Sequence, residues 1–161
     1  MTETISERRT PADPLLALAA NLAELVPGDP LVGVTAISGD ETVVAAWSSP
    51  RARLVEQAQL IWGGSPGLEA LRTGKPVSVP DLRRAQRWSE WAVELRLLGL
   101  GSSYSLPVRD GTGPIAVVDL YADRRHGFEA DIDHLLIPRL PAIAAALTGG
   151  TPRARSRPSC S

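Results

Sequence analysis

Apolar residues recur along the chain with the periods of helices and of strands, and glycines and prolines separate these segments. The first helix is predicted to begin at Pro14, after a polar stretch over residues 1–12 that we expect to be flexible. Its apolar face consists of leucines at spacings of three and four, namely Leu15, Leu18, Leu22 and Leu25. Two β-rich runs over residues 31–37 and 42–47 follow, and the polar residues between them predict a hairpin.

The middle of the chain predicts further helices and one short strand. A helical stretch comes first, and one of its faces carries Leu54, Ala58 and Ile61. A short helix follows between Ser65, a suitable N-cap, and Gly74. Residues 77–79 then predict a strand, which leads into another helix. The stripe along that helix consists of Trp88, Trp91, Leu95 and Leu98.

A second hairpin is predicted around Asp110 and Gly111, because this dipeptide favours a two-residue turn. With these two residues in the turn, Ser102 lies opposite Asp119. One face of the hairpin then carries small or apolar residues, which are Ser103, Ser105, Ala116, Val118 and Leu120. The other face carries the polar residues Ser102, Tyr104, Asp119 and Tyr121.

The polar face predicts a small-molecule pocket, because hydroxyl groups and a carboxylate would lie beneath a helix that carries two tryptophans. Ligand pockets combine apolar walls with a few polar groups of this kind. The predicted ligand-binding residues are Ser102, Tyr104, Asp119, Tyr121, Trp88 and Trp91. The alternative is that Asp119 and Ser102 bond neighbouring backbone groups or face solvent. A register shift of one residue would exchange the two faces.

The order of these elements predicts an α+β fold, in which an antiparallel sheet has helices on both faces. A length of 161 residues suits one domain, which we place over residues 13–148. A composition of 43% hydrophobic and 22% charged residues is typical of a globular domain. The last helix is predicted over residues 128–148, where Pro138 and Pro141 interrupt it.

The net charge of -1 at pH 7 gives no overall attraction to nucleic acid or to anionic membranes, so neither is an expected partner. Residues 149–161 predict a disordered basic tail. The charges of this tail are Arg153, Arg155 and Arg157, which leave weak, salt-sensitive association with nucleic acid as an alternative. The N-terminal residues differ from a signal peptide, and no apolar run is long enough to span a bilayer. We therefore expect a cytoplasmic protein.

Candidate catalytic motifs fail on physical grounds. Residues 63–67 read Gly-Gly-Ser-Pro-Gly, which matches the G-x-S-x-G turn of serine hydrolases. The oxyanion hole of that motif uses the N–H of the residue after the serine, and here that residue is Pro66, which has no N–H. With one cysteine, Cys160, and two histidines, the chain also lacks the ligands of a common zinc site. We expect no catalytic residues, no metal and no cofactor.

Two segments carry a family resemblance. They are SPGLEALRTGKPVSVPDLRRAQRW and GLGSSYSLPVRDGTGPIAVVDLYADRRHGFEADIDHLL. Together they resemble a GAF domain, closest to the bacterial type that often precedes an RNA-binding ANTAR domain, although we expect no ANTAR domain after it. The resemblance implies a sheet of about six antiparallel strands, with the terminal helices on one side and a ligand pocket on the other. GAF domains are usually small-molecule sensors that signal through a dimer formed by their terminal helices.

The chain also departs from well-defined GAF activities. It carries Gly67 where relatives often have a cysteine, and it lacks the cysteines of methionine-sulfoxide-reducing members, the bilin-attachment cysteine and the cyclic-nucleotide signature. The resemblance therefore implies a non-enzymatic regulatory or sensor domain of bacterial signal transduction. We expect it to bind an unidentified small molecule or a partner protein, to form a homodimer through its terminal helices and to act on a separate output protein. The alternative is a scaffold for dimerisation or docking, whose pocket is filled by Trp88, Trp91 and Tyr104.

Overall fold

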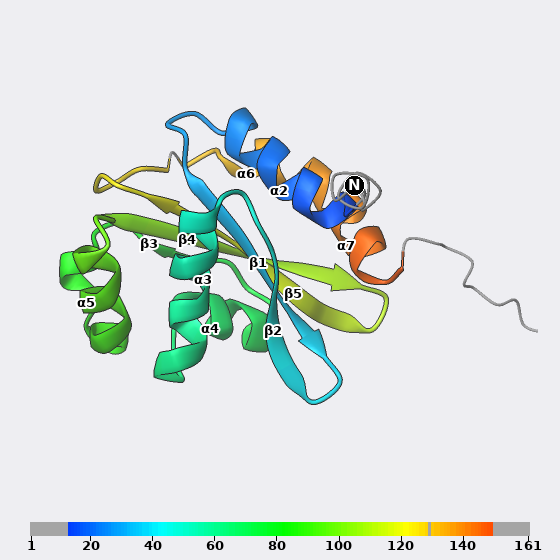
Figure 1. The fold of residues 1–161 in the computed structure, drawn as a ribbon, viewed down its shortest axis with the longest axis horizontal. Helices are drawn as coiled ribbons and strands as arrows, with labels where there is room; N and C mark the ends of the chain where they lie inside the picture. The colour runs from blue at the N-terminus through cyan, green and yellow to red at the C-terminus, as the bar shows by residue number, and fades with distance from the viewer. Residues whose placement is uncertain (1–12, 129, 150–161) are drawn as a thin grey trace, which may run out of the picture.

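A five-stranded antiparallel sheet in the order β2-β1-β5-β4-β3 forms the centre of the molecule (Figure 1). The computed structural model describes residues 13–128 and 130–149, so the predictions for residues 1–12 and for the tail arginines lie outside the described residues. The strands are β1 (Leu31–Ser38), β2 (Glu41–Trp47), β3 (Val77–Val79), β4 (Ser102–Asp110) and β5 (Gly113–Ala122). The α+β class is confirmed, with five strands against the expected number of about six.

Helices cover both faces of this sheet, as predicted (Figure 1). The helices from the two ends of the chain lie on one face, and they are α2 (Pro14–Leu25), α6 (Asp133–Leu136) and α7 (Leu140–Leu147). On the other side lie α3 (Pro50–Trp62), α4 (Pro66–Thr73) and α5 (Ser89–Leu97). Short 3-10 turns complete the chain, namely η1 (Leu82–Arg84) and η2 (Gln86–Trp88) before α5, and η3 (Ile137–Arg139) between α6 and α7. None of the helices within the described ranges is both long and apolar enough to span a bilayer.

Local capping signals set the ends of the helices. The side chains of Asp13, Ser49 and Ser65 each accept a hydrogen bond from a backbone N–H in the first turn of α2, α3 and α4, and a proline follows each cap. Ser65 is therefore an N-cap, as the sequence predicted. At the other end of α4, Gly74 adopts a left-handed conformation with φ 75°, which suits glycine.

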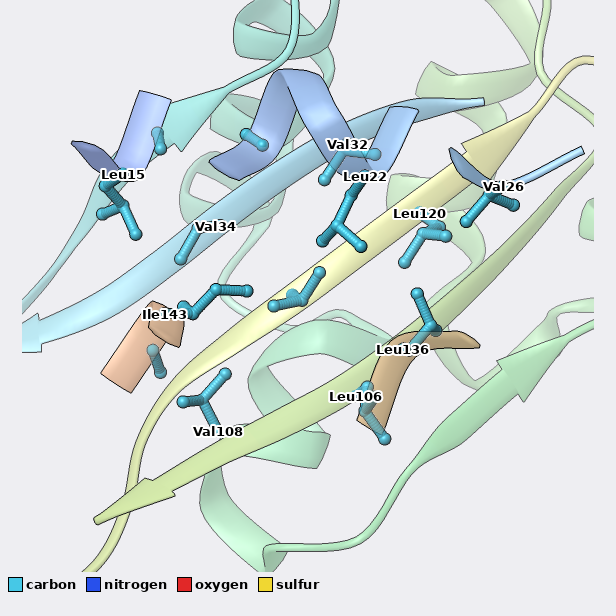
Figure 2. Close-up of a cluster of buried hydrophobic side chains, with 14 of the residues drawn as sticks. Leu15, Leu22, Val26, Val32, Val34, Leu106, Val108, Leu120, Leu136 and Ile143 are labelled. Atoms are coloured by element: carbon cyan, nitrogen blue, oxygen red, sulfur yellow. The ribbon is translucent and has the colours of Figure 1, made fainter. Parts of the chain in front are cut away.

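The main hydrophobic core lies between the sheet and the terminal helices. Figure 2 shows leucines and an isoleucine from α2, α6 and α7 pointing toward valines and leucines of β1, β4 and β5. The fully buried members include Leu22, Val32, Val108, Leu120 and Leu136, each at most 2% exposed. Burying side chains of this size stabilises the fold by about 1.5–3 kcal/mol each, so this face of the sheet forms the hydrophobic core.

The turn of the second hairpin differs from the prediction. Asp110 pairs with Gly113, so the turn consists of Gly111 and Thr112 instead of Asp110 and Gly111. The Asp110 carboxylate accepts hydrogen bonds from the backbone N–H of Thr112 at 2.7 Å and from its hydroxyl at 2.6 Å, and these bonds stabilise the observed turn. An irregularity between Val108 and Arg109 shifts the register further.

As a result, the predicted polar face is divided between the two sides of the sheet. Ser105, not Ser102, lies opposite Asp119, because the pairing has moved by three residues. An odd shift turns every side chain of β4 to the other face. Ser102 and Tyr104 therefore lie on the side of the terminal helices, whereas Asp119 and Tyr121 lie under α3, α4 and α5. The predicted common face for these four residues is wrong.

Candidate functional site

Helix α3 presents polar side chains to the sheet. Leu54 and Ile61, which the sequence placed on one apolar face, are 54% and 70% exposed. Glu56 and Gln59 point inward instead and are at most 1% exposed. The helix turns this way because its smaller residues, including Val55, pack against the sheet side while its larger apolar residues remain outside. Sequence reasoning missed Glu56 and Gln59.

These two residues join Asp119 in a buried polar network. The Gln59 amide donates to Asp119 Oδ2 and to Glu56 Oε2, both at 3.0 Å. Glu56 also accepts hydrogen bonds from the Thr35 hydroxyl at 2.7 Å and from the Tyr121 hydroxyl at 2.5 Å. The remaining members are serines, since Ser105 donates to Asp119 at 2.6 Å and Ser65 donates to Gln59 at 2.5 Å. We call these seven residues the buried polar network.

The two carboxyl groups of the network cannot both be charged at little cost. Burial raises the pKa of Glu56 well above its usual range, and the neighbouring Asp119 carboxylate raises it further. Burial also raises the pKa of Asp119, although hydrogen bonds from Ser105 and Gln59 favour its charged form. Burial thus favours the protonated form of both groups, and it raises the pKa of Glu56 most strongly.

Two glycines make room for these carboxyl groups. A Cβ atom at Gly33 of β1 would lie 2.6 Å from the carboxyl carbon of Glu56. A Cβ atom at Gly67 of α4 would lie 2.6 Å from Asp119 Oδ1 and 2.4 Å from Gln59 Oε1. A glycine within an apolar strand is a sequence signal of a close approach, so Gly33 could have indicated the site.

Substitution of Gly67 tests this packing. We expect Gly67→Ala to destabilise the domain by about 1–3 kcal/mol, because the new methyl group overlaps the Asp119 carboxylate and the network must shift. Gly111→Ala is the matched control, since its Cβ would meet no atom within 4 Å. Urea unfolding measures both variants. Equal stability of the two would contradict the close packing of Gly67 against the network.

The other predicted ligand residues have structural contacts of their own. The Ser102 hydroxyl donates to the carbonyl of Arg124 at 2.7 Å and accepts from the Gly127 N–H at 3.1 Å. The Tyr104 hydroxyl donates to Asp133 of α6 at 2.5 Å. Thus Ser102 fixes the loop after β5, and Tyr104 fixes a terminal helix.

The two tryptophans predicted for the pocket, Trp88 and Trp91, lie in different environments. Trp91 is 2% exposed and packs with Tyr121 and Leu82, so its indole ring occupies the space above this part of the sheet. Its Nε1 atom and the hydroxyl of the buried Ser103 find no hydrogen-bond partner among the described residues. Trp88 is only half-buried and lines an open cleft instead.

This cleft has a volume of about 540 Å³ and lies beside the edge strand β3. Residues 78–88 form one part of its wall, and the loop after β5 contributes Arg125 and His126. Its charged and aromatic lining consists of Asp81, Arg83, Arg84, Arg87, Trp88 and Arg125. We call it the arginine cleft. Sequence reasoning missed it because residues 81–88 and 125 meet only in the folded chain.

Metal chemistry finds no support in the part of the chain that the structure describes. No group of three or more histidine, cysteine or acidic side chains within it could hold an ion. Asp119 and Glu56 stand alone as a carboxyl pair, and their other neighbours are an amide and hydroxyl groups. The network therefore joins its two buried carboxyl groups through the amide of Gln59.

Comparison with known proteins identifies the family. The model of the GAF domain family matches residues 10–147. A type II free methionine-R-sulfoxide reductase from Thermoplasma acidophilum has a similar structure, with TM-score 0.67 and 17% identity over 83% of this chain and 89% of that one. The GAF domain region of a putative membrane protein from Geobacter sulfurreducens PCA gives TM-score 0.63 and 17% identity, over 84% and 89% of the two chains.

The GAF domain of a two-component sensor histidine kinase from Bacillus halodurans is similar as well, with TM-score 0.62 and 13% identity over 86% of this chain and 94% of that one. No curated protein matches the chain. At these identities the solved structures show the fold, whereas the family match extends over most of the sequence. The chain belongs to the GAF domain family.

Proposed function

We propose that this domain is a non-enzymatic regulatory GAF module, which recognises a small molecule or a partner protein in bacterial signal transduction. The similar reductase from Thermoplasma acidophilum raises the question of sulfoxide chemistry. Protein thiols are the groups that such redox chemistry uses. Cys160 is the single cysteine of the sequence, and the similar fold therefore supports recognition better than reduction.

This proposal rests on one observation, namely that both carboxyl groups of the buried polar network already have hydrogen-bond partners within the protein. Asp119 accepts from Ser105 and Gln59, and Glu56 accepts from Thr35 and Tyr121, so each acidic group is already occupied. A general base or a nucleophile needs a free position within hydrogen-bond reach of a substrate. The network offers structural support for the sheet face instead.

The arginine cleft also lacks a catalytic relay, although Ser78, Asp81 and His126 all line it. Both oxygens of Asp81 are bound by the guanidinium of Arg83, at 3.1 Å each. Within the described residues no hydrogen bond joins Ser78 to His126. A triad needs its carboxylate on the histidine and its histidine on the nucleophile. The open space beside β3 thus supports binding.

A homodimer through the terminal helices is part of the proposal, as is a separate output protein in the cytoplasm. A groove of about 290 Å³ between α2 and α7 supports it. Its apolar lining consists of Leu18, Leu22, Leu25 and Ile143. Apolar grooves on terminal helices are suited to packing against a second copy of the same surface.

A scaffold without a ligand is the second candidate function. The buried position of Trp91 favours it, because this indole ring and Tyr121 occupy space on the face where a pocket was predicted. In that case the domain would serve dimerisation or protein docking alone. The two candidate functions differ in one property that an experiment can measure, namely whether a small molecule remains bound to the purified protein.

Native mass spectrometry of the full chain, purified from the cells that produce it, tests both candidates. We expect a dimer whose mass exceeds twice the chain mass by that of a bound compound. A retained compound that raises the melting temperature when added back would support the regulatory module, since a ligand at 100 times its Kd adds about 2.7 kcal/mol to unfolding. A bare dimer would support the scaffold instead, and a bare monomer would contradict both.

A further inference from the structure

The arginine cleft concentrates positive charge in a small open space. Four arginines line it against one acidic side chain, Asp81. Arg83 binds Asp81 with two parallel hydrogen bonds, and the Nε atom of Arg84 lies 3.7 Å from the same carboxylate. Hydrogen bonds from Arg83, with a smaller contribution from the charge of Arg125, lower the pKa of Asp81 to about 2, so the carboxylate is charged at neutral pH.

The other two arginines that line the cleft, Arg87 and Arg125, are both exposed. Arg87 is exposed and has one acidic neighbour, Glu69, at 3.5 Å. Arg125 is exposed as well, and no ion pair or hydrogen bond of its guanidinium occurs with the described residues. Guanidinium groups bind phosphate oxygens in a bidentate manner, and several of them around one cleft suit a doubly charged anion.

The loop that carries Arg125 is held in place by its own backbone contacts. His126 has a φ of 53°, and its N–H donates to the carbonyl of Pro80 at 2.7 Å. Gly101 allows the same loop to approach β4, since a Cβ there would lie 2.9 Å from the Arg125 backbone nitrogen. Ser102 anchors the loop on both sides of Arg125. A positive φ outside glycine persists only where its surroundings require it.

Trp88 adds a flat apolar wall to this charged cleft. The guanidinium carbon of Arg87 lies 4.5 Å from the centre of its ring. Val79, Pro80 and Ala85 complete the apolar part of the lining. A volume of about 540 Å³ is within the range of small-molecule pockets. The cleft therefore combines sites for an anionic group with a surface for a ring.

We propose that the arginine cleft binds a phosphorylated small molecule, with the phosphate at Arg87 and Arg125 and a flat ring against Trp88. This inference rests on the proposed regulatory function and names the chemical class and the place of its ligand. The site is separate from the buried polar network, which lies under α3 and α4 and contributes none of the residues that line the cleft.

Titration calorimetry with phenyl phosphate tests the proposal on the full chain. We expect saturable binding that weakens as salt is added, and that weakens about tenfold or more in Arg125→Ser, because a hydrogen bond to a charged group is lost. Arg53→Ser is the matched control, since the Arg53 guanidinium stacks on Trp47 at the opposite edge of the sheet. It should bind phenyl phosphate as the parent chain does.

A second comparison measures how much the ring of the ligand contributes to binding. Phenyl phosphate should bind at least about fivefold more tightly than inorganic phosphate, and Trp88→Ala should remove this preference. Absence of saturable binding, equal losses in the two arginine variants, or a ring preference that survives Trp88→Ala would each overturn the proposal. If Arg125→Glu still retained the cellular compound in native mass spectrometry, the cleft assignment would fail while the regulatory function stood.

Discussion

Glu56→Ala is expected to destabilise the domain by about 3–5 kcal/mol, because it removes the acceptor of several buried donors at once. The hydroxyls of Thr35 and Tyr121 and the amide of Gln59 would all lose a partner in a region closed to water. Urea unfolding measures the loss. Glu56→Gln is the conservative control, since an amide has the shape of the protonated acid, and we expect it to cost about 1 kcal/mol at pH 7.

The same pair of variants tests the protonation of Glu56. Its folded-state pKa lies above the unfolded value of about 4.3, so the folded chain binds more protons than the unfolded chain above this pH. Stability of the parent chain should therefore fall as pH rises from 5 toward the folded pKa, whereas Glu56→Gln should show a smaller dependence, which comes from Asp119 alone. Between pH 5 and 9 the free energy of unfolding of the parent chain should therefore decrease relative to that of Glu56→Gln.

Asp119 titrates together with Glu56, because burial raises its pKa as well, so the pH dependence of the parent chain belongs to the carboxyl pair. Asp81 and Tyr121 do not contribute to it. The pKa of Asp81 is lowered to about 2, so its contribution to stability changes only below the tested range. Burial raises the pKa of Tyr121 above its usual value, which places its titration on the alkaline side of pH 9. Parallel stability profiles for Glu56→Gln and the parent chain would show that Glu56 is charged in the folded state.

Trp91→Ala is expected to cost about 3–5 kcal/mol, because its side chain is 2% exposed and its removal leaves a cavity beside Tyr121 and Leu82. Trp62→Ala, at a tryptophan that is 40% exposed, should cost about 1 kcal/mol or less. Added indole should restore part of the stability of Trp91→Ala through binding to the folded state, and should leave Trp62→Ala unchanged.

The rescue experiment also tests whether the sheet face that carries Asp119 can form a ligand pocket. If indole binds saturably, removal of one side chain is enough to turn this part of the sheet into a ligand pocket. If the variant neither loses stability nor binds indole, Trp91 does not fill that space and the packing described for it is wrong. Unfolding midpoints with and without indole distinguish these results.

Local sequence signals predicted most of the secondary structure. The helix that begins at Pro14, the N-cap at Ser65 and the stop at Gly74 depend on residues within one or two turns of each other. The strands at 31–38 and 77–79 follow from β-rich runs between turn residues. These features need no distant partner, and for that reason the α+β fold could be predicted correctly.

The candidate site depended on a detail that the local signals placed wrongly. Asp110 and Gly111 favour a two-residue turn, yet Thr112 binds the Asp110 carboxylate and moves the turn by one residue. Together with the irregularity at Val108, this change reversed the faces of β4. The one-residue shift of the turn changes the pairing by two and keeps the faces, whereas the irregularity between Val108 and Arg109 adds one more residue and turns Ser102 and Tyr104 away from Asp119.

The sequence by itself determined most of the elements, their order and the family, because these follow from capping, periodicity and motif residues close together in the chain. The last helix is an exception, since it begins at Asp133 and not at residue 128. Only the tertiary structure decided that Glu56 faces inward. A buried carboxyl group is stable where partners surround it, and those of Glu56 come from Thr35 and Tyr121, 21 and 65 residues away. In the same way, folding alone brings Arg125 to the cleft beside Arg84.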